Sequence, residues 1–156
     1  MKAAKIALSA LALVCASALT VPGFAQDMGF MTVTPKQLKW GDSPALPGAK
    51  VALIEGPMDK ANPFIMRIRL PAKYKIAPHF HSGVEHVTVI SGTFSIGHGE
   101  KFDAKKTTAV GPGGVAVMQP NTPHFVRTTK ETVIQVHGVG PWTLTFVNPA
   151  DDPRKK

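Results

Sequence analysis

From Val51 onward, apolar and polar residues alternate over short distances. In the segment PFIMRIRL (63–70), Met66, Ile68 and Leu70 alternate with two arginines, which is the two-residue period of a half-buried strand. Similar segments follow in the order HVTVI, GTFSIG, GGVAVMQ, HFVRT, TVIQVHG and WTLTFVN, separated by the clusters GPGG, PNTP and GVGP. No long segment has a helical period. The pattern predicts an all-β fold, an antiparallel sandwich or barrel, with Met66 and Ile68 in its apolar interior wall.

The first 25 residues have a different character. Lys2 and Lys5 precede the apolar run IALSALALVCASALTV, and small residues end at Ala25, a pattern typical of a secretory signal peptide. A retained membrane anchor is the alternative, but the run is short for a spanning helix. A lipoprotein at Cys15 is disfavoured because Val14 stands where such sites have a small residue. We expect a periplasmic or secreted protein with no stable membrane anchor after cleavage.

The mature chain would keep 131 residues in one domain. We expect an N-terminal arm over 26–49, the folded domain over 50–148 and a short tail over 149–156. Cys15 is the only cysteine, so no disulfide would support the mature fold. Loss of two lysines with the leader would leave 16 basic against 10 acidic residues, a formal charge of +6. The basic residues are scattered except in DPRKK, so a nucleic-acid partner is not expected.

The segment PHFHSGVEH carries the candidate chemistry. His79 and His81 are two residues apart and therefore share one face of a strand. Two imidazoles in an apolar interior would cost about 1–3 kcal/mol each if left without partners, and a shared metal ion removes that cost. Glu85 follows the turn-forming pair Ser82-Gly83, so its carboxylate can return to the same centre. The alternative is a polar strand that happens to be rich in histidine.

A fourth donor lies far away in the sequence. His124 begins a predicted strand after QPNTP, where Pro120 and Pro123 restrict their own φ angles and bias the residues before them toward extended geometry. Such a rigid turn suits a side chain that must reach a defined point. His79, His81, Glu85 and His124 are therefore the predicted metal ligands.

These residues resemble the two motifs of the cupin family. In the first motif, His79, His81, Glu85 and Gly92 stand at the family spacing, whereas Lys73 occupies the place of the first glycine. The second motif matches at Gly113 and His124. It departs at three positions, where Gln119, Asn121 and Thr128 replace proline, glycine and asparagine. The resemblance covers about residues 50–148, and its short spacing between the motifs is similar to that of small single-domain bacterial cupins, including a ChrR-type subgroup.

The resemblance implies a single cupin barrel, also described as a double-stranded β-helix or jelly-roll. It implies one divalent transition metal, Fe, Mn, Ni, Cu or Zn, all of which accept this mixture of ligands. The protein would be a metal-dependent catalyst, dioxygenase-like or a lyase or hydrolase, acting on a small polar molecule, with Glu85 able to move protons. The alternatives are a non-enzymatic cupin that binds or senses a metal or small ligand, and a purely structural metal. A homodimer is also implied.

Other polar residues are weaker candidates. Gln135 and His137 share strand parity, so both would reach the pocket if that face lines the barrel. His86 should face away from the ligands, and His98 should lie in a solvated loop. Trp142 could line the mouth of the barrel, although ordinary packing is the simpler explanation.

Overall fold

The computed structural model describes residues 29–156, so the predicted signal peptide, residues 1–25, lies outside the described residues. Residues 33–156 form one compact unit. Its strands are β1 (Gly41–Asp42), β2 (Lys50–Glu55), β3 (Pro63–Leu70), β4 (Lys75–His81), β5 (Glu85–Ser91), β6 (Phe94–His98), β7 (Thr108–Val110), β8 (Val115–Met118), β9 (His124–Arg127), β10 (Thr132–Val139) and β11 (Leu144–Phe146). Single 3-10 turns occur at Pro35–Gln37, Ala104–Lys106, Pro149–Asp151 and Pro153–Lys155. Among residues 29–156, no helix is long and apolar enough to cross a membrane.

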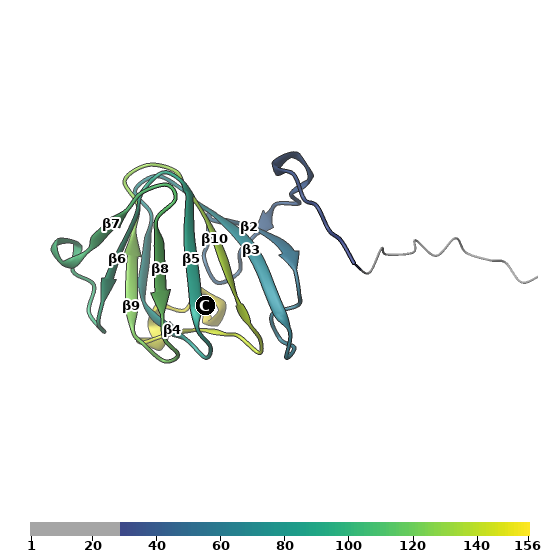
Figure 1. Cartoon of the computed structure of the whole chain (residues 1–156). Helices are drawn as coiled ribbons and strands as arrows, with labels where there is room; N and C mark the ends of the chain where they lie inside the picture. Colours follow the sequence, from purple (N-terminus) through teal and green to yellow (C-terminus); the bar gives the residue numbers. More distant parts are fainter. Residues whose placement is uncertain (1–28) are drawn as a thin grey trace, which may run out of the picture. The chain divides into compact units, whose positions relative to one another are not determined.

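The strands form two antiparallel sheets (Figure 1). One sheet has the order β1-β2-β3-β10-β5-β8, and the other has the order β11-β4-β9-β6-β7. Neighbours in a sheet are often distant in sequence, as where β10 lies between β3 and β5. This arrangement confirms the expected all-β class and is that of a jelly-roll barrel.

The alternation predicted for 63–70 is observed in β3. Phe64, Met66, Ile68 and Leu70 are buried, whereas the intervening side chains are only partly covered. Across the sheet Ile68 pairs with Ile134, so inward side chains of neighbouring strands meet and form the core between the sheets. Burial of such aliphatic side chains contributes about 1.5–3 kcal/mol each and is the main stabilising term of the fold.

The second half of the expected arm is built into the barrel. Gly41–Asp42 pairs with β2, and both Leu46 and Ala49 are buried. The hydroxyl of Tyr74 donates a hydrogen bond to the carbonyl of Pro47, 2.8 Å away. Residues 41–49 therefore belong to the wall of the unit, although their Pro- and Gly-rich sequence has no strand pattern.

Two departures from the cupin motifs occur where the backbone has positive φ. Lys73 stands in place of a glycine at φ +57°, and Asn121 does so at φ +58°. A third replacement, Thr128, is buried; its hydroxyl donates to the carbonyl of Pro71 (2.6 Å) and accepts from the backbone N–H of Tyr74 (3.0 Å). The backbone turns of the motifs are thus kept with different residues.

Candidate metal centre

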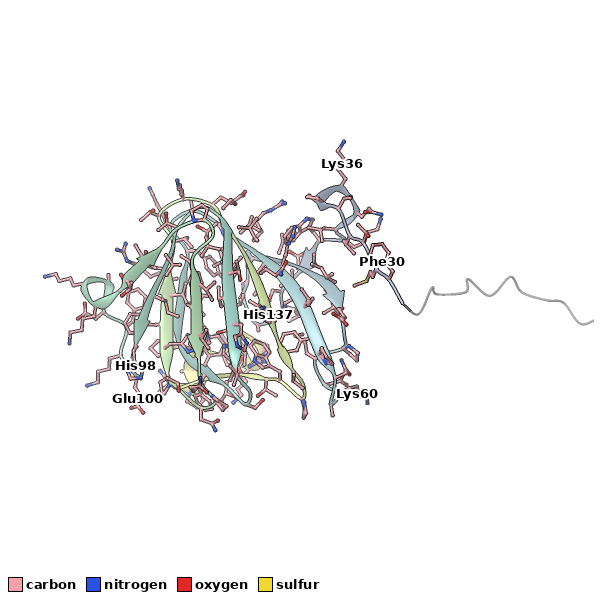
Figure 2. All side chains as sticks on the ribbon, in the orientation of Figure 1. Phe30, Lys36, Lys60, His98, Glu100 and His137 are labelled. Atoms are coloured by element: carbon pink, nitrogen blue, oxygen red, sulfur yellow. The ribbon has the colours of Figure 1, made fainter. Side chains whose placement is uncertain are left out.

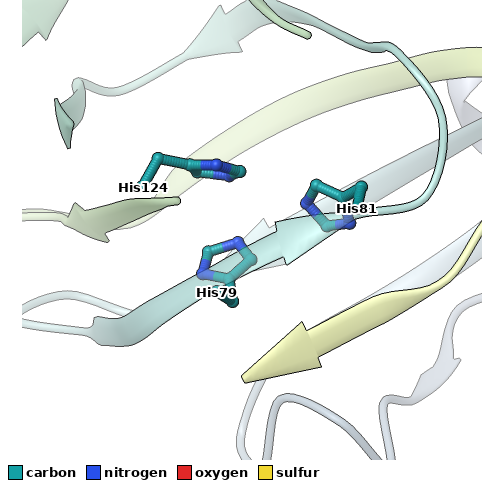
Figure 3. A group of neighbouring side chains, drawn as sticks. All are labelled: His79, His81 and His124. Carbon is teal, nitrogen blue, oxygen red and sulfur yellow. The ribbon is translucent and has the colours of Figure 1, made fainter. Parts of the chain in front are cut away.

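Three histidines converge inside the barrel (Figure 3). His79 and His81 project from the same face of β4, and His124 begins the neighbouring strand β9, where it pairs with His79. The ring centroids of His79 and His124 are 4.2 Å apart, and His81 lies 5.1 and 5.2 Å from those two rings. One nitrogen of each histidine lies within 4.8 Å of the others. All three side chains are buried.

Each imidazole is held through Nδ1 by a main-chain carbonyl. The pairs are His79 with Ala77 (2.8 Å), His81 with Thr143 (2.9 Å) and His124 with Thr122 (2.9 Å). A carbonyl oxygen only accepts hydrogen bonds, so Nδ1 carries the proton in each case. This leaves Nε2 of each ring as the atom that would bind a metal through its lone pair.

Glu85 completes the cluster from a third strand. It is the first residue of β5 and is buried, on the same inward parity as Val87. Its Oε2 lies 3.2 Å from Nε2 of His81 and 3.4 Å from Nε2 of His124. Burial alone would raise the pKa of Glu85, but in the absence of metal a proton on Nε2 of His124 or His81 can donate to the carboxylate, and this outweighs burial and lowers the pKa of Glu85 to about 2. The side chain is therefore a carboxylate at neutral pH.

This arrangement fits a metal cation. Burial, followed by the neighbouring His124 and His81, lowers the pKa of His79 to about 3, so this ring stays neutral. The Nε2 atom of His81 is buried and has no hydrogen-bond partner among the described residues, although a carboxylate lies beside it. Lone pairs that face a carboxylate repel it unless a positive charge lies between them. Three imidazole nitrogens and one carboxylate oxygen form a donor set that divalent transition metals accept.

Trp142 supports the site from the loop between β10 and β11. Its indole stacks on His81, with centroids 4.1 Å apart and planes 12° apart, and it also contacts Phe64 at 5.3 Å between centroids. The stacking could not be predicted from the sequence, because the alternation of WTLTFVN does not identify which side chain, 61 positions earlier, Trp142 meets.

A cavity of about 490 Å³ opens beside the cluster. The three histidines and Glu85 line it, as do Met66 and Ile68, which the alternation had predicted for the interior wall. Further apolar wall residues are Leu70, Ile76, Phe94, Val126, Ile134 and Leu144. The candidate metal centre is therefore in contact with a chamber of the size typical of small-molecule sites.

Gln135 and His137 do not line this cavity, and their expected role there is wrong. In β10 it is Ile134 that faces the cavity, which puts the opposite parity on the outer side of the sheet. Gln135 accepts a hydrogen bond from Arg67 at 3.3 Å. His137, labelled in Figure 2, stacks on His86 with centroids 4.7 Å apart and planes 8° apart.

His98, expected in a loop, is instead the last residue of β6 (Figure 2). Its side chain is exposed, as expected for a solvated histidine.

Comparison with known proteins identifies the fold. No protein-family model matches the sequence, and no curated protein is similar enough in sequence to match. Solved structures do match. The polyketide cyclase RemF from Streptomyces resistomycificus has a TM-score of 0.65 at 18% sequence identity, over 81% of this chain and 91% of that one.

Two further structures point the same way. A candidate acetylacetone dioxygenase from Methylibium petroleiphilum PM1 has a TM-score of 0.61 at 20% identity, over 80% of this chain and 85% of its own. An RmlC-like cupin from Shewanella frigidimarina NCIMB 400 has a TM-score of 0.56 at 12% identity, over 69% and 87% of the two chains. The finer resemblance to a ChrR-type subgroup stays a prediction. The two sheets, the inward histidine cluster and these similarities together identify the chain as a protein with the cupin fold.

Proposed function

We propose that the protein binds one divalent transition metal and uses it as a catalyst on a small molecule that enters the cavity. His79, His81 and His124 would hold the metal through Nε2, and Glu85 through a carboxylate oxygen. The observation that carries this proposal is the orientation of the imidazoles: each donates Nδ1–H to the backbone, so the unprotonated nitrogens face one another.

The four side chains would leave about two positions of a six-coordinate ion free. When bound, the metal would supply Lewis acidity at those positions. The histidines would orient it through their carbonyl hydrogen bonds, and the apolar wall would exclude water. Glu85 is a carboxylate at neutral pH, so it would also accept a proton at Oε2 and return it later in the reaction.

The reaction class stays open between dioxygenase-like and lyase or hydrolase chemistry. Two proteins of the same fold are named as a polyketide cyclase and a candidate acetylacetone dioxygenase, which supports a catalytic use of such a barrel. The signal-peptide pattern of residues 1–25 supports the further proposal that the protein acts in the periplasm or outside the cell.

A second candidate function is metal or small-ligand binding without turnover. The observation in its favour is the state of the other charged groups at the cavity. Asp42 is paired with Lys50 at 2.7 Å, and Arg154 is paired with Asp152 at 2.8 Å. Apart from the proposed metal ligands, the described residues that line the cavity therefore include no titratable side chain that is free of an ion pair.

The test is the metal content of the mature protein. The native protein would be purified from the periplasm and analysed for bound metals beside His124→Ala and His137→Ala, the latter a control on the outer side of the sheet. We expect about one metal ion per chain in the native protein and the control, and loss of the metal in His124→Ala. Absence of metal from all three, even after reconstitution, would refute the proposal.

The identity and exchange of the metal then separate the two candidate functions. Exchangeable iron, manganese, nickel or copper would support catalysis and direct a substrate screen with and without oxygen. Zinc that does not exchange would favour binding, sensing or a structural role.

A further inference from the structure

The wall of the cavity is chemically uneven. At one place it carries the imidazoles and Glu85, and elsewhere it consists mainly of aliphatic and aromatic side chains such as Ile68, Ile134 and Phe94. These three side chains are buried and come from different strands. A ligand that reaches the histidines therefore leaves most of its surface against hydrocarbon.

The other charged groups at the cavity are already neutralised. Arg154 donates from Nε and Nη2 to the two carboxylate oxygens of Asp152, at 2.8 and 2.9 Å, and Nη2 also donates to the carbonyl of Leu144 at 3.0 Å. Asp42 accepts from Nζ of Lys50 at 2.7 Å. Neither Arg154 nor Asp42 offers an unpaired charge to a ligand.

Two of the uncharged polar residues at the cavity are also engaged, whereas the indole Nε1–H of Trp142 is a buried donor with no hydrogen-bond partner among the described residues. Ser43 accepts a hydrogen bond from the backbone N–H of Leu46 at 3.2 Å. The N–H of Thr143 donates to Ser82 at 3.0 Å, and its carbonyl accepts from His81. Away from the histidines and this one indole donor, a small polar molecule would lose its hydration without gaining equivalent hydrogen bonds, and an unpaired buried polar group is strongly disfavoured.

We propose that the ligand is a predominantly apolar molecule, an aromatic or aliphatic ring compound, that carries one chelating pair of oxygen atoms. The apolar body would lie against the wall that includes Ile68 and Ile134, and the oxygens would point to His79, His81 and His124. The chelating end rests on the proposed metal function, whereas the apolar body rests on the wall alone. The sequence predicts a small polar substrate. The inference confines that polar character to the end of the ligand that faces the histidines.

A matched pair of probes tests the inference. Benzohydroxamate and acetohydroxamate have the same chelating group and differ only in the apolar body. Isothermal titration of the metal-loaded protein should show benzohydroxamate binding at least ~10-fold more tightly, because its ring leaves water on binding. Equal binding, or tighter binding of acetohydroxamate, would overturn the inference while leaving the metal function intact.

Two substitutions in β3 locate the effect. Ile68→Trp fills the cavity, whereas Ile65→Trp introduces the same side chain on the outer face of the same strand. We expect Ile68→Trp to lose ~10-fold or more of the benzohydroxamate affinity at unchanged metal content, and Ile65→Trp to bind normally. Circular dichroism melts establish folding, and Ile134→Phe, a smaller insertion from β10, replaces Ile68→Trp if that variant does not fold. Normal binding by a folded cavity-filling variant would contradict the assignment.

A metal-free arm separates failure of this inference from failure of the metal function. Toluene, which has no chelating group, should bind the metal-free protein in ligand-observed NMR, because dry apolar cavities accept such molecules. Toluene binding by a protein that takes up no metal would refute the metal function and keep the apolar site. Metal uptake without toluene binding, and without a preference for benzohydroxamate, would refute the apolar site and keep the metal function.

Discussion

The imidazole of His81 lies flat against the indole of Trp142, with 4.1 Å between ring centroids and 12° between planes. The residue after this tryptophan, Thr143, accepts the Nδ1–H hydrogen bond of the same imidazole at 2.9 Å. One short loop therefore fixes both the tilt and the tautomer of a candidate ligand. Trp142 also lines the cavity, so the loop connects the ligand wall with the candidate metal centre.

The first prediction concerns this stacking. Trp142→Ala should destabilise the fold by about 3–5 kcal/mol, because a large buried ring is lost. It should also weaken metal binding about 10-fold, because His81 loses an orienting contact. Trp142→Phe keeps an aromatic face and should lose much less of both. Thermal melts and competition with a chromophoric chelator measure the two effects. Native metal affinity in folded Trp142→Ala would show that the stacking has no role at the site.

The second prediction concerns the carboxylate. Glu85→Gln keeps the size of the side chain but removes the negative charge that lies 3.2–3.4 Å from two imidazoles. Metal affinity should fall at least ~10-fold. Glu100→Gln is the control, because Glu100 is exposed (Figure 2). If both variants bind metal equally well in the competition assay, Glu85 is not a ligand.

The third prediction concerns acid stability in the absence of metal. The pKa of His79 is about 3 in the folded chain, against 6.5 for an ordinary histidine. Between these values the unfolded chain binds a proton that the folded chain does not, so folding stability falls as the pH falls below about 6.5. We expect the metal-free protein to be about 2 kcal/mol less stable at pH 5 than at pH 8.

Urea unfolding at the two pH values measures this loss. His79→Asn should reduce it, whereas His98→Asn, with its exposed side chain, should leave it unchanged. Glu85 adds a loss of the same sign, because its pKa is also lowered in the folded chain, but only below about pH 4.5. A loss in His79→Asn as large as in the native protein would contradict the prediction.

The fourth prediction concerns the replaced glycines. Lys73 has φ +57° and Asn121 has φ +58°, a left-handed conformation that costs most residues about 1–2 kcal/mol. Lys73→Gly should therefore stabilise the protein by about 0.5–1 kcal/mol. Asn121→Gly should gain less, because asparagine tolerates this region better than lysine. Chemical denaturation measures both, and a destabilised Lys73→Gly would indicate that the lysine side chain has a compensating contact.

Much of the fold follows from strand alternation. In 63–70 the arginines mark the outer face without ambiguity, so the inward direction of Met66 and Ile68 could be predicted. The segment TVIQVHGV is different, because Val133, Ile134 and Val136 place apolar residues on both parities. Alternation cannot choose a face there, so the expectation for Gln135 and His137 depends on which face lines the barrel, and the structure shows that theirs does not.

The residues of the candidate site also fall into those that the sequence could predict and those that it could not. Four donors could be predicted because their spacing on strands and turns constrains where they point. The stacking of Trp142 on His81 and the contacts of residues 41–49 could not be predicted, since alternation does not tell which distant residue a side chain meets and residues 41–49 have no strand period. Burial in the finished fold, rather than local propensity, decides their positions.

Because all three imidazoles are anchored by main-chain carbonyls, no single side-chain replacement can delete an anchor. The Nδ1 anchors are consequently insulated from mutation of the surrounding side chains, and only the tilt of His81 depends in addition on a side chain, that of Trp142. Such a barrel can exchange the aliphatic lining of its chamber, and with it the molecule it admits, while the three imidazoles keep their backbone anchors.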